Sequence, residues 1–527
     1  MTALLTDNLP LLAGAPNGIK KLRELILELA VRGKLVPQDP NDEPASELLN
    51  LLMTEAGSAT GRGKGKKQAL PGITESEQLF ILPEGWVWGR LGDVTEVLDS
   101  LRKPVTKQDR KPGPYPYYGA SGVVDYVSAY IFDEPLVLVG EDGAKWGAGE
   151  RTAFSISGKT WVNNHAHVLR PKRSVVLDDY LVISLVAQDL SQFITGMTVP
   201  KLNQARLTSI GISLPPLAEQ HRIVAKVDEL MALCDRLEAR QADADSAHTQ
   251  LVQALLDSLT QARDAGDFAQ SWQRLAEHFH TLFTTESSID ALKQTLLQLA
   301  VMGKLVPQDP SDEPASELLK RISEKRAAGL AGRRSPKQTA LSSIGPDEKS
   351  FELPSNWEWV RLQQIISVSS GDGLVSTNMK PEGGIPVYGG NGITGYHDEK
   401  NVDTETLVIG RVGYYCGSIH LTPAQAWITD NALRVSFSEE NIYKEFLYWL
   451  LKGTNLKEQE NATAQPVISG RKIYPIVIAI PPLAEQHRIV AKVDQLMALC
   501  DQLKARLSQA RQVHEQLANA LVEQAVA

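Results

Sequence analysis

Apolar residues recur at helical spacing in four segments of this chain. Residues 18–35 and 290–305 place them three and four positions apart, the pattern of a short amphipathic helix. Residues 489–521 alternate steps of four and three, which predicts a coiled-coil seam. Residues 223–255 begin the same seam, become polar near their middle and then resume it. The predicted seam residues are Ile223, Val227, Leu230, Cys234, Leu237, Ile489, Val493, Leu496, Cys500 and Leu503.

Residues 81–214 and 351–480 follow a different pattern, in which short apolar or alternating runs are separated by glycine-containing turns. Such runs are typical of β-strands. Both segments begin with a pair of tryptophans and continue to a Tyr-Gly-x-x-Gly turn, at 118–122 and 388–392. Each is predicted to be a mostly-β module with one or two helices, and we call them module 1 and module 2. The tryptophans expected in their cores are Trp86, Trp88, Trp357 and Trp359.

The helical segments repeat along the chain, whereas the modules diverge. Residues 29–49 return almost unchanged at 299–319, and residues 215–235 return almost unchanged at 481–501. The order of short helix, module and long helix therefore occurs twice, and an internal repeat of this kind decides the fold. We predict an α+β fold in which two mostly-β modules are joined by long helices. These helices would form an antiparallel coiled-coil spacer with pseudo-two-fold symmetry, and the terminal helices would together correspond to the central pair.

This pattern divides the chain into seven predicted segments. Gly-, Lys- and Arg-rich stretches such as 57–67 are typical of flexible linkers, and they separate the helical segments from the modules. The segments are an N-terminal helical region at 1–52, a flexible basic linker at 53–80, module 1 at 81–214, a central helical region at 215–322, a flexible linker at 323–350, module 2 at 351–480 and a C-terminal helix at 481–527.

Composition narrows the class of protein. The net charge of −9 disfavours a protein that binds DNA through a broad basic surface, so nucleic-acid binding would need a local basic face or partner subunits. With only Cys234, Cys416 and Cys500, a disulfide framework is not expected, which fits a reducing cytoplasm. No apolar run is long enough to span a bilayer, and the first residues lack the pattern of a secretory signal. We expect a cytoplasmic protein.

Candidate catalytic motifs are incomplete. Ser157-Gly-Lys-Thr160 resembles the end of a phosphate-binding loop but lacks the leading glycine, which is Ala153 here. His165 and His167 have no Cys/His cluster beside them, and module 2 has Asn and Leu at these places. The Glu141–Lys145 segment resembles a nuclease carboxylate–lysine motif, but module 2 does not repeat it, and no adenine-methyltransferase motif is present. The chain is predicted to be non-catalytic, with no metal site.

Side chains suited to base recognition lie in corresponding loops of both modules. Asn pairs with adenine edges, Arg and Lys with guanine, and Asp accepts from cytosine. Their types differ between the modules while the framework is constant, as expected if each module recognises a different base sequence, although each could also be an ordinary loop residue. The candidates are Lys145, Trp146, Asn163, Asn164, His165, Lys201, Asn203 and Arg206 in module 1, and Arg411, Tyr414, Tyr415, Asp430, Asn431, Ser469, Arg471 and Lys472 in module 2.

Together these features resemble the specificity subunit (HsdS) of type I restriction–modification systems. The resemblance is carried by Pro-Pro-Leu-Ala-Glu-Gln-His-Arg-Ile-Val, which occurs at 215–224 and at 481–490 after each variable module. It implies that the modules are target-recognition domains that bind a split, asymmetric site in double-stranded DNA. It also implies that the chain holds two methyltransferase subunits, which restriction subunits then join. S-adenosylmethionine, ATP and Mg²⁺ would belong to those partners.

The resemblance implies a division of labour. Each domain would recognise one half-site, the coiled coil would set the gap between them, and the partner subunits would methylate an adenine in each half at N6. Two alternatives remain at this point. A nuclease fused to a coiled coil would need a carboxylate cluster in at least one module. The other alternative is a coiled-coil scaffold with two protein-interaction modules and no role on DNA. Divergent loops that carry Asn, Arg and Lys do not exclude it.

Overall fold

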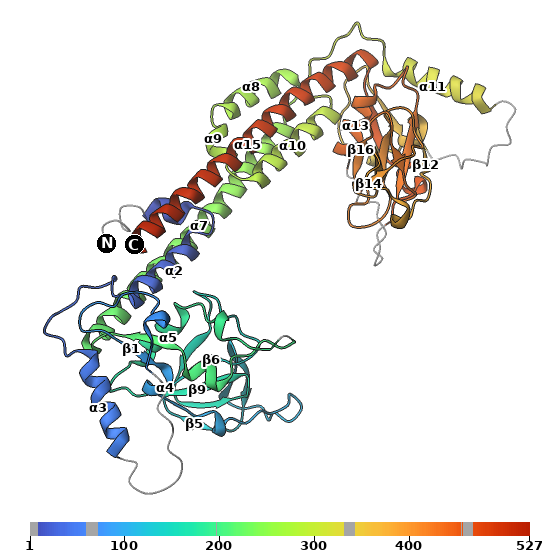
Figure 1. Ribbon diagram of the computed structural model, residues 1–527. Helices are drawn as coiled ribbons and strands as arrows, with labels where there is room; N and C mark the ends of the chain where they lie inside the picture. Colours follow the sequence, from blue (N-terminus) through green and yellow to red (C-terminus); the bar gives the residue numbers. More distant parts are fainter. Residues whose placement is uncertain are drawn as a thin grey trace. The chain divides into compact units, whose positions relative to one another are not determined.

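The computed structural model describes residues 9–58, 72–196, 198–330, 343–454, 456 and 467–526. The chain forms two compact units, each with one sheet-rich module and its own helices (Figure 1). Unit 1 consists of Met1–Ala244 and Ala510–Ala527, and unit 2 consists of Asp245–Gln509. The predicted α+β class with two sheet-rich modules and long helices is confirmed.

Unit 1 packs three helices together. They are α2 (Gly18–Val31), the first part of α7 (Leu217–Thr260) and the last part of α15 (Leu483–Val526). Leu25 of α2, Cys234 of α7 and Ala518 of α15 are buried in one core. Lys21 Nζ contacts Glu515 Oε1 at 3.2 Å and Asn519 Oδ1 at 2.8 Å. The end of the C-terminal helix therefore lies against the N-terminal helix, as the circular phasing predicts.

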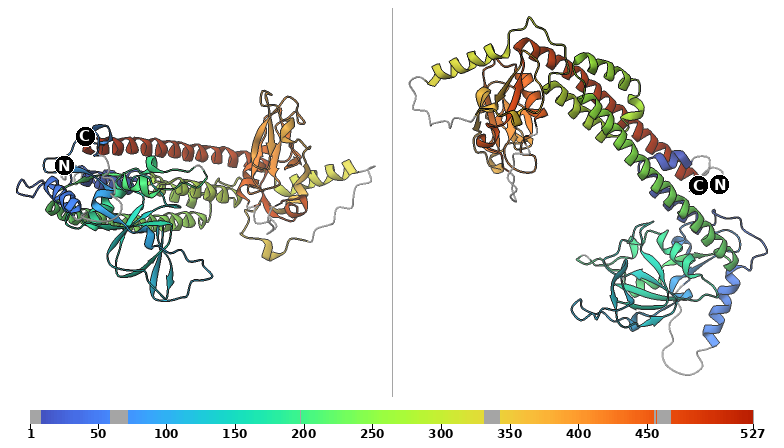
Figure 2. Two further views of the ribbon diagram at one scale, coloured as in Figure 1. Left: turned by 60° about the horizontal axis from the view of Figure 1, so that its bottom comes forward. Right: turned by 180° about the vertical axis from the view of Figure 1, so that it is seen from behind.

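Unit 2 repeats this packing with a different set of segments. The end of α7, α10 (Glu286–Val301) and the first part of α15 share one core, in which Leu292 and Cys500 are buried (Figures 1 and 2). All ten predicted seam residues are buried in, or packed against, the core of their own unit. The apolar side of these helices thus faces the core of its own unit.

Two further helices of unit 2 were not predicted. They are α8 (Ala265–Ala276) and α9 (Phe279–Leu282), which follow α7. An aromatic cluster holds them, in which the Trp272 ring lies 5.8 Å from Phe268 and 5.1 Å from Phe279. The Asp264 carboxylate caps α8 by accepting from the Gly266 and Asp267 N–H groups at 2.9 Å.

Module 1 contains two four-stranded sheets and a two-stranded one. The sheets have the orders β2-β9-β6-β7, β4-β3-β8-β5 and β1-β10. The entire β6 strand, Leu136–Gly140, is buried. The strands are β1 (Val87–Arg90), β2 (Thr95–Val97), β3 (Tyr115–Gly119), β4 (Gly122–Val127), β5 (Phe132–Asp133), β6, β7 (Ala153–Ile156), β8 (Lys159–Val162), β9 (Ala166–Pro171) and β10 (Gly211–Leu214), with helices α4 (Leu91–Val94), α5 (Asp178–Val186) and α6 (Gln204–Thr208).

Module 2 has the same plan. Its sheets are β12-β18-β15-β16, β14-β13-β17 and β11-β19. In module 1, β3 pairs in parallel with β8, so that Tyr117 lies opposite Trp161. In module 2, β13 pairs in parallel with β17, so that Val387 lies opposite Trp427. The elements are β11 (Glu358–Arg361), β12 (Ile366–Ser370), β13 (Ile385–Gly389), β14 (Gly392–His397), β15 (Leu407–Gly410), β16 (Ile419–Leu421), β17 (Trp427–Ile428), β18 (Ala432–Phe437) and β19 (Val477–Ile480), with helices α12 (Leu362–Ile365), α13 (Lys444–Gly453) and α14 (Gly470–Ile473).

The repeated sequence segments form a joint between each module and its long helix. In unit 1 the Trp86 Nε1–H donates to Glu219 Oε2 at 3.0 Å, and Gln38 Nε2 donates to Glu219 Oε1 at 3.2 Å. The Leu177 N–H donates to Gln220 Oε1 at 2.9 Å. Glu219 is 1% exposed, and this burial raises the pKa of its carboxyl above the ordinary value.

Unit 2 has the same joint. The Trp357 Nε1–H donates to Glu485 Oε2 at 3.0 Å, Gln308 Nε2 donates to Glu485 Oε1 at 2.7 Å, and the Tyr443 N–H donates to Gln486 Oε1 at 2.8 Å. Burial raises the pKa of the Glu485 carboxyl as well. The expectation that the first tryptophan of each module is a core residue is therefore confirmed. The repeated motifs have a structural reason, since they attach each module to a helix.

Two predicted linker boundaries are wrong. Helix α3 (Ala45–Ser58) extends beyond residue 52, and α11 (Ala315–Leu330) extends beyond residue 322. In α11 the buried Ile322 and the hydrogen bond from Arg326 to the Gln363 carbonyl hold the helix against module 2. The Gly- and Arg-rich parts of both predicted linkers lie mostly outside the described residues. Among the helices that the structure describes, none combines the length and apolar character needed to cross a membrane.

Candidate nucleic-acid interface

Three loops meet at one end of module 1, and backbone hydrogen bonds join them. The first loop follows β6, the second precedes β9 and the third precedes α6. The Glu141 N–H donates to the His165 carbonyl at 2.9 Å, and the Leu202 N–H donates to the Glu141 carbonyl at 2.8 Å. We call this arrangement the three-loop junction. It brings together the loops that carry seven of the eight candidates of module 1, and the eighth, Arg206, lies on α6 directly after the third loop.

Module 2 builds the same junction at equivalent positions. The Arg411 N–H donates to the Asn431 carbonyl, and the Ile468 N–H donates to the Arg411 carbonyl, both at 2.9 Å. Because these bonds join backbone groups, they place no requirement on the side chains above them. The two modules can therefore present different side chains from the same backbone frame.

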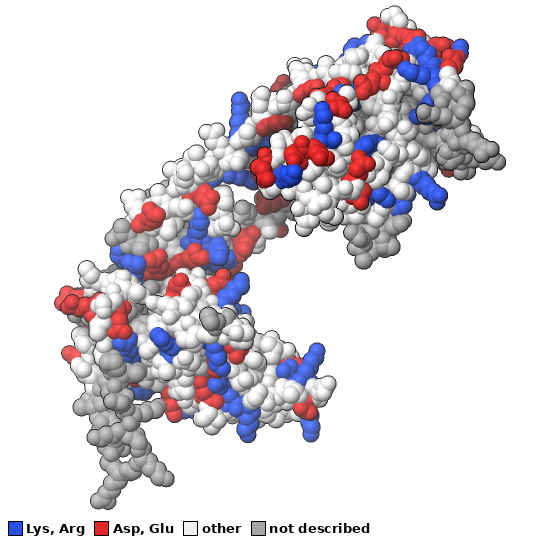
Figure 3. Space-filling view, turned by 45° about the vertical axis from the view of Figure 1, so that its right-hand side comes forward, with Lys and Arg blue, Asp and Glu red and all other residues white. Residues whose placement is uncertain are grey.

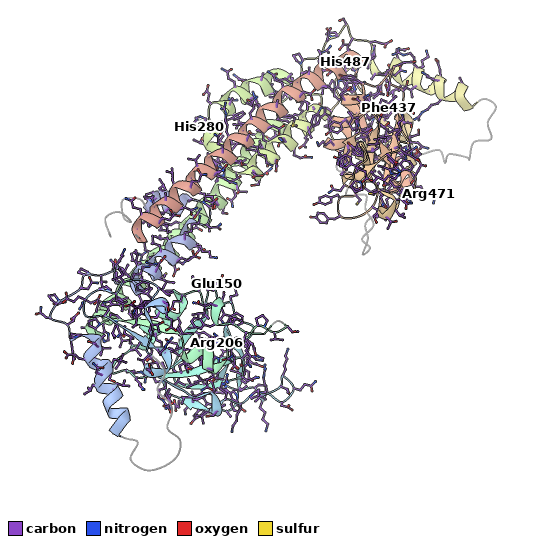
Figure 4. All side chains as sticks on the ribbon, in the orientation of Figure 1. Glu150, Arg206, His280, Phe437, Arg471 and His487 are labelled. Carbon is purple, nitrogen blue, oxygen red and sulfur yellow. The ribbon has the colours of Figure 1, made fainter. Side chains whose placement is uncertain are left out.

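Some candidates of module 1 face solvent. The Lys145 side chain is 80% exposed, with its Nζ 3.8 Å from a Glu150 carboxylate oxygen. His165 is half exposed, and its Nδ1 is paired with the Asp142 carboxylate. Asn164 is exposed beside it. Arg206 is also exposed and lies on α6 (Figure 4). These side chains are placed to meet a ligand.

The other candidates of module 1 hold the loops in place. The Trp146 ring packs against the core of unit 1, and its Nε1–H donates to the Gly140 carbonyl at 3.1 Å. Asn163 is buried, and its Oδ1 accepts from the His165 N–H at 2.8 Å. The Asn203 Oδ1 caps α6 by accepting from the Arg206 N–H at 2.9 Å. The interpretation of Trp146, Asn163 and Asn203 as base-contacting residues therefore finds no support in their geometry.

In module 2 two of the exposed candidates are aromatic. Tyr414 and Tyr415 are 74% and 54% exposed, with ring centroids 5.0 Å apart and planes at 88°. Arg411 precedes the two tyrosines in the same loop. Its Nη1 donates to Ser370 Oγ and to the Asp430 carbonyl, both at 3.2 Å. The side chains of Asp430 and Asn431 are exposed on the adjoining loop.

The third loop of module 2 divides in the same way. Ser469 precedes α14, and its carbonyl accepts from the Lys472 and Ile473 N–H groups at 2.9 and 3.1 Å. Lys472 Nζ turns back to the Val467 carbonyl at 3.4 Å. Arg471 is exposed (Figure 4). Arg471 is thus placed to meet a ligand, while Ser469 and Lys472 hold the turn.

A buried ionic cluster underlies the junction of module 1. His167 is 1% exposed, with Nδ1 2.6 Å from Asp99 Oδ2 and Nε2 2.7 Å from the Leu202 carbonyl oxygen. Arg102 pairs with Glu141 and lies 3.3 Å from Asp99 Oδ2. Sequence spacing gave no signal for Asp99 or Arg102, because they come from a separate turn after β2.

The cluster also bears on metal binding. Asp99, Glu141 and His167 offer ligand atoms that lie within 4.8 Å of one another, close enough to hold an ion. However, Lys201 Nζ lies 2.7 Å from Glu141 Oε1, and Arg102 occupies the other carboxylate oxygen. Hydrogen bonding to Glu141 raises the pKa of the Lys201 ammonium. The carboxylates are already neutralised by cations, so this chemistry fits a structural ion-pair network better than a metal site.

A groove of about 800 Å³ opens beside the junction of module 1. Its walls include Asp142, Arg151 and His165 together with the Tyr118-Gly-x-x-Gly turn. The Arg151 guanidinium lies over the Phe154 ring, 5.4 Å from its centroid. The groove therefore combines hydrogen-bonding, charged and aromatic groups. Asp142 and Arg151 were not among the residues predicted to recognise bases. Asp142 lies in the Glu141–Lys145 segment, which was compared only with a nuclease motif.

Charge is mixed over the visible surface. In Figure 3 the Lys and Arg side chains are interspersed with Asp and Glu over both units, and no broad patch of one sign covers that face. This agrees with the net charge of −9. On this face, electrostatic attraction to a polyanion would depend on individual cations rather than on a broad basic patch.

Comparison with known proteins connects these features to one family. The model of the type I restriction modification DNA specificity domain matches residues 83–244 and 354–510, which contain both modules. The specificity subunit of the type I restriction enzyme EcoEI from Escherichia coli is 35% identical over 97% of this chain and 94% of its own length. That of EcoAI, also from Escherichia coli, is 34% identical over the same shares.

A solved structure also covers most of the chain. The HsdS subunit from Thermoanaerobacter tengcongensis is 18% identical, and the match covers 86% of this chain and 99% of that one with a TM-score of 0.39. At this TM-score the match adds nothing to the fold described above.

Proposed function

Because the chain belongs to the type I restriction–modification specificity family, we propose that each module is a target-recognition domain that binds one half of a bipartite, asymmetric DNA target. The observation that carries the proposal is the three-loop junction. Its backbone hydrogen bonds are the same in both modules, while the exposed side chains differ. A constant frame with variable side chains suits two domains that recognise different base sequences.

The exposed junction residues have the chemistry that base recognition requires. His165 paired with Asp142, Asn164 and Arg206 are available in module 1. Module 2 offers the exposed Asp430 and Asn431, together with the half-buried Arg411 that bonds to the Asp430 carbonyl. Arginine suits guanine, asparagine suits adenine, and aspartate accepts from the cytosine amino group. We propose that these residues contact base edges and that the inward-facing loop residues only position them.

Partner subunits complete the proposed assembly. The helical parts of the two units would bind two methyltransferase subunits, which methylate adenine at N6, and restriction subunits would join them. S-adenosylmethionine, ATP and Mg²⁺ would be bound by these partners, and this chain would supply no catalytic residue. Partner surfaces would also supply most phosphate contacts, since this chain has a net charge of −9.

We also propose that α7 and α15 keep the half-sites at a fixed separation. Each is a 44-residue helix that contributes residues to both units. In other DNA-binding proteins the geometry between two reading elements sets the spacing of half-sites. The three cysteines are buried and form no disulfide bond, which supports a place for the assembly in the reducing cytoplasm.

A genome-wide map of N6-methyladenine tests this function. The map is compared between the source strain and a strain that lacks the gene. We expect a split motif with a fixed gap that disappears on deletion. Unchanged methylation in a strain whose methyltransferase subunits are expressed and active would contradict the proposal and favour the scaffold without a role on DNA.

Exchange of a single module provides the matched experiment. Residues 81–214 are replaced by the corresponding domain of a relative with a different target, and residues 351–480 are exchanged in a second variant. Each exchange should change one half of the methylated motif and leave the other half and the gap unaltered. A change in both halves from either exchange would exclude modular recognition.

A further inference from the structure

The loops that follow β6 and β15 correspond position by position. Each begins with a charged residue at the junction, Glu141 or Arg411, and turns at a glycine with positive φ, 69° at Gly143 and 91° at Gly413. Such φ values favour glycine because it has no Cβ. Three positions further along, Trp146 packs against the core of unit 1, as the buried Cys416 packs in unit 2.

Between the glycine and the inward-facing residue, each loop exposes a two-residue tip. The tip is Ala144-Lys145 in module 1 and Tyr414-Tyr415 in module 2. Both ends of each tip are fixed, one by the junction and the other by the inward-facing side chain. The tips therefore occupy equivalent places in their modules but carry unlike chemistry.

The tip of module 1 offers a mobile point charge. The Lys145 side chain is 80% exposed, and its nearest carboxylate oxygen, on Glu150, is 3.8 Å from Nζ. An ammonium on a flexible stem has no fixed direction for its hydrogen bonds, so it suits a phosphate oxygen better than a particular base edge. Phosphate contacts add affinity but carry no sequence information.

The tip of module 2 offers two oriented aromatic rings. The rings of Tyr414 and Tyr415 meet edge to face at 88°, and Gly417, with φ of 85°, and the buried Cys416 end the turn directly behind them. Ring pairs of this geometry stabilise each other. Two large aromatic side chains that remain 74% and 54% exposed form a surface for apolar contacts with base edges, such as the thymine methyl group.

The junction beneath each tip strengthens this difference. In module 1 the Glu141 carboxylate is neutralised by Arg102 and Lys201, so these cations are engaged within the protein. In module 2 the equivalent Arg411 precedes Tyr414 by three residues and is oriented by Ser370 Oγ and the Asp430 carbonyl. A guanidinium oriented by such contacts suits base recognition.

On the basis of the proposed function, we infer that the equivalent tips perform unlike tasks. Tyr414 and Tyr415 determine sequence specificity in the half-site bound by module 2, through contacts that depend little on salt. Lys145 binds a backbone phosphate in the half-site bound by module 1 and contributes affinity that does not depend on sequence.

The test uses the assembled complex with its methyltransferase subunits. Its dissociation constant is measured between 50 and 200 mM salt on the cognate duplex and on duplexes altered in one half-site. Lys145→Ala should weaken binding to all duplexes alike and reduce the slope of log Kd against log salt by about 1. Tyr414→Ala with Tyr415→Ala should leave that slope unchanged and reduce discrimination against changes in the second half-site about tenfold, the cost of about one mismatched base pair.

Conservative variants separate these effects from misfolding. Lys145→Arg should restore the salt slope, and Tyr414→Phe with Tyr415→Phe should restore discrimination because the rings remain. Loss of discrimination on Lys145→Ala, or a changed salt slope with intact discrimination in the tyrosine variant, would overturn the assignment. If the wild-type complex itself does not distinguish the duplexes, the proposed function fails; if it does and both alanine variants behave like it, only the tip inference fails.

Discussion

The joint between module 1 and α7 gives a prediction whose size follows from its contacts. Trp86→Phe keeps an aromatic ring but removes the N–H that donates to Glu219 Oε2 at 3.0 Å. Glu219 is 1% exposed, so no solvent replaces the lost donor, and Gln38 remains at 3.2 Å from the other carboxylate oxygen. A hydrogen bond to a charged group contributes about 1.5–3 kcal/mol, and the smaller ring adds a cavity cost. We expect local stability of the joint to fall by at least this amount.

Hydrogen exchange measured by mass spectrometry can detect this change locally. Amides that exchange through local opening should exchange about 10- to 150-fold faster, since about 1.4 kcal/mol corresponds to a factor of ten. The joint of unit 2 is a built-in control because it has the same motif with Trp357 and Glu485. Peptides spanning 211–224 and 477–490 end in identical residues but begin differently, so their masses distinguish them.

The reasoning requires a selective effect. Trp86→Phe should accelerate exchange in 211–224 and leave 477–490 unchanged, and Trp357→Phe should do the reverse. Exchange in 211–224 that stays within about threefold of the wild type would show that the buried hydrogen bond does not hold the joint. Equal acceleration in both peptides would refute the view that each joint belongs to its own unit.

Three further predictions concern buried charges and thiols. Arg102→Met should destabilise module 1 by about 3–5 kcal/mol, because it leaves Asp99 and Glu141 short of a buried cation; exchange in Leu136–Gly140 should rise while Leu407–Gly410 is unchanged. Glu485→Gln removes a carboxyl whose pKa in the folded protein is raised by burial. The protonated carboxyl stabilises the wild type fully below the ordinary pKa of 4.5, and this contribution is lost as pH rises through the folded pKa. Thermal unfolding should therefore show the variant gaining stability relative to the wild type between pH 4 and 8. Burial raises the pKa of Cys500 to about 11, so iodoacetamide at pH 8 should label it only after denaturation, as mass spectrometry can measure.

The helices could be predicted because their periodicity reports burial directly. Cys234 and Cys500 occupy heptad positions, and both are buried in helical cores. The position of the C-terminal helix against the N-terminal one followed from the circular order of the repeat. By contrast, α8 and α9 lie outside the repeated segments. Gly266 suggested an interruption of the helical region, whereas it lies in the first turn of α8, where its N–H donates to the capping Asp264 carboxylate.

The candidate site was predictable as a set of loops but not as individual contacts. Side-chain direction in a loop depends on turn geometry, and neither residue type nor spacing reveals it. Trp146 and Asn163 have the chemistry of ligand contacts, yet one packs inward and the other supports His165. Arg102, which pairs with Glu141, and Asp99, which pairs with Arg102, were missed because they lie far from Glu141 in sequence and approach it only when the sheet forms.

The two modules can diverge because the backbone hydrogen bonds that join their loops do not involve the varying side chains. At each joint, repeated residues such as Glu219 and Glu485 attach the module to a helix. At each junction, backbone groups hold the loops, so the exchange of Glu141 for Arg411 reverses a charge without changing the hydrogen bonds that place the tip. A reversed charge within a buried core would require several compensating changes, and module 1 has such compensation in Arg102 and Lys201. Recognition chemistry can therefore change at the tips while the frame that presents them stays constant.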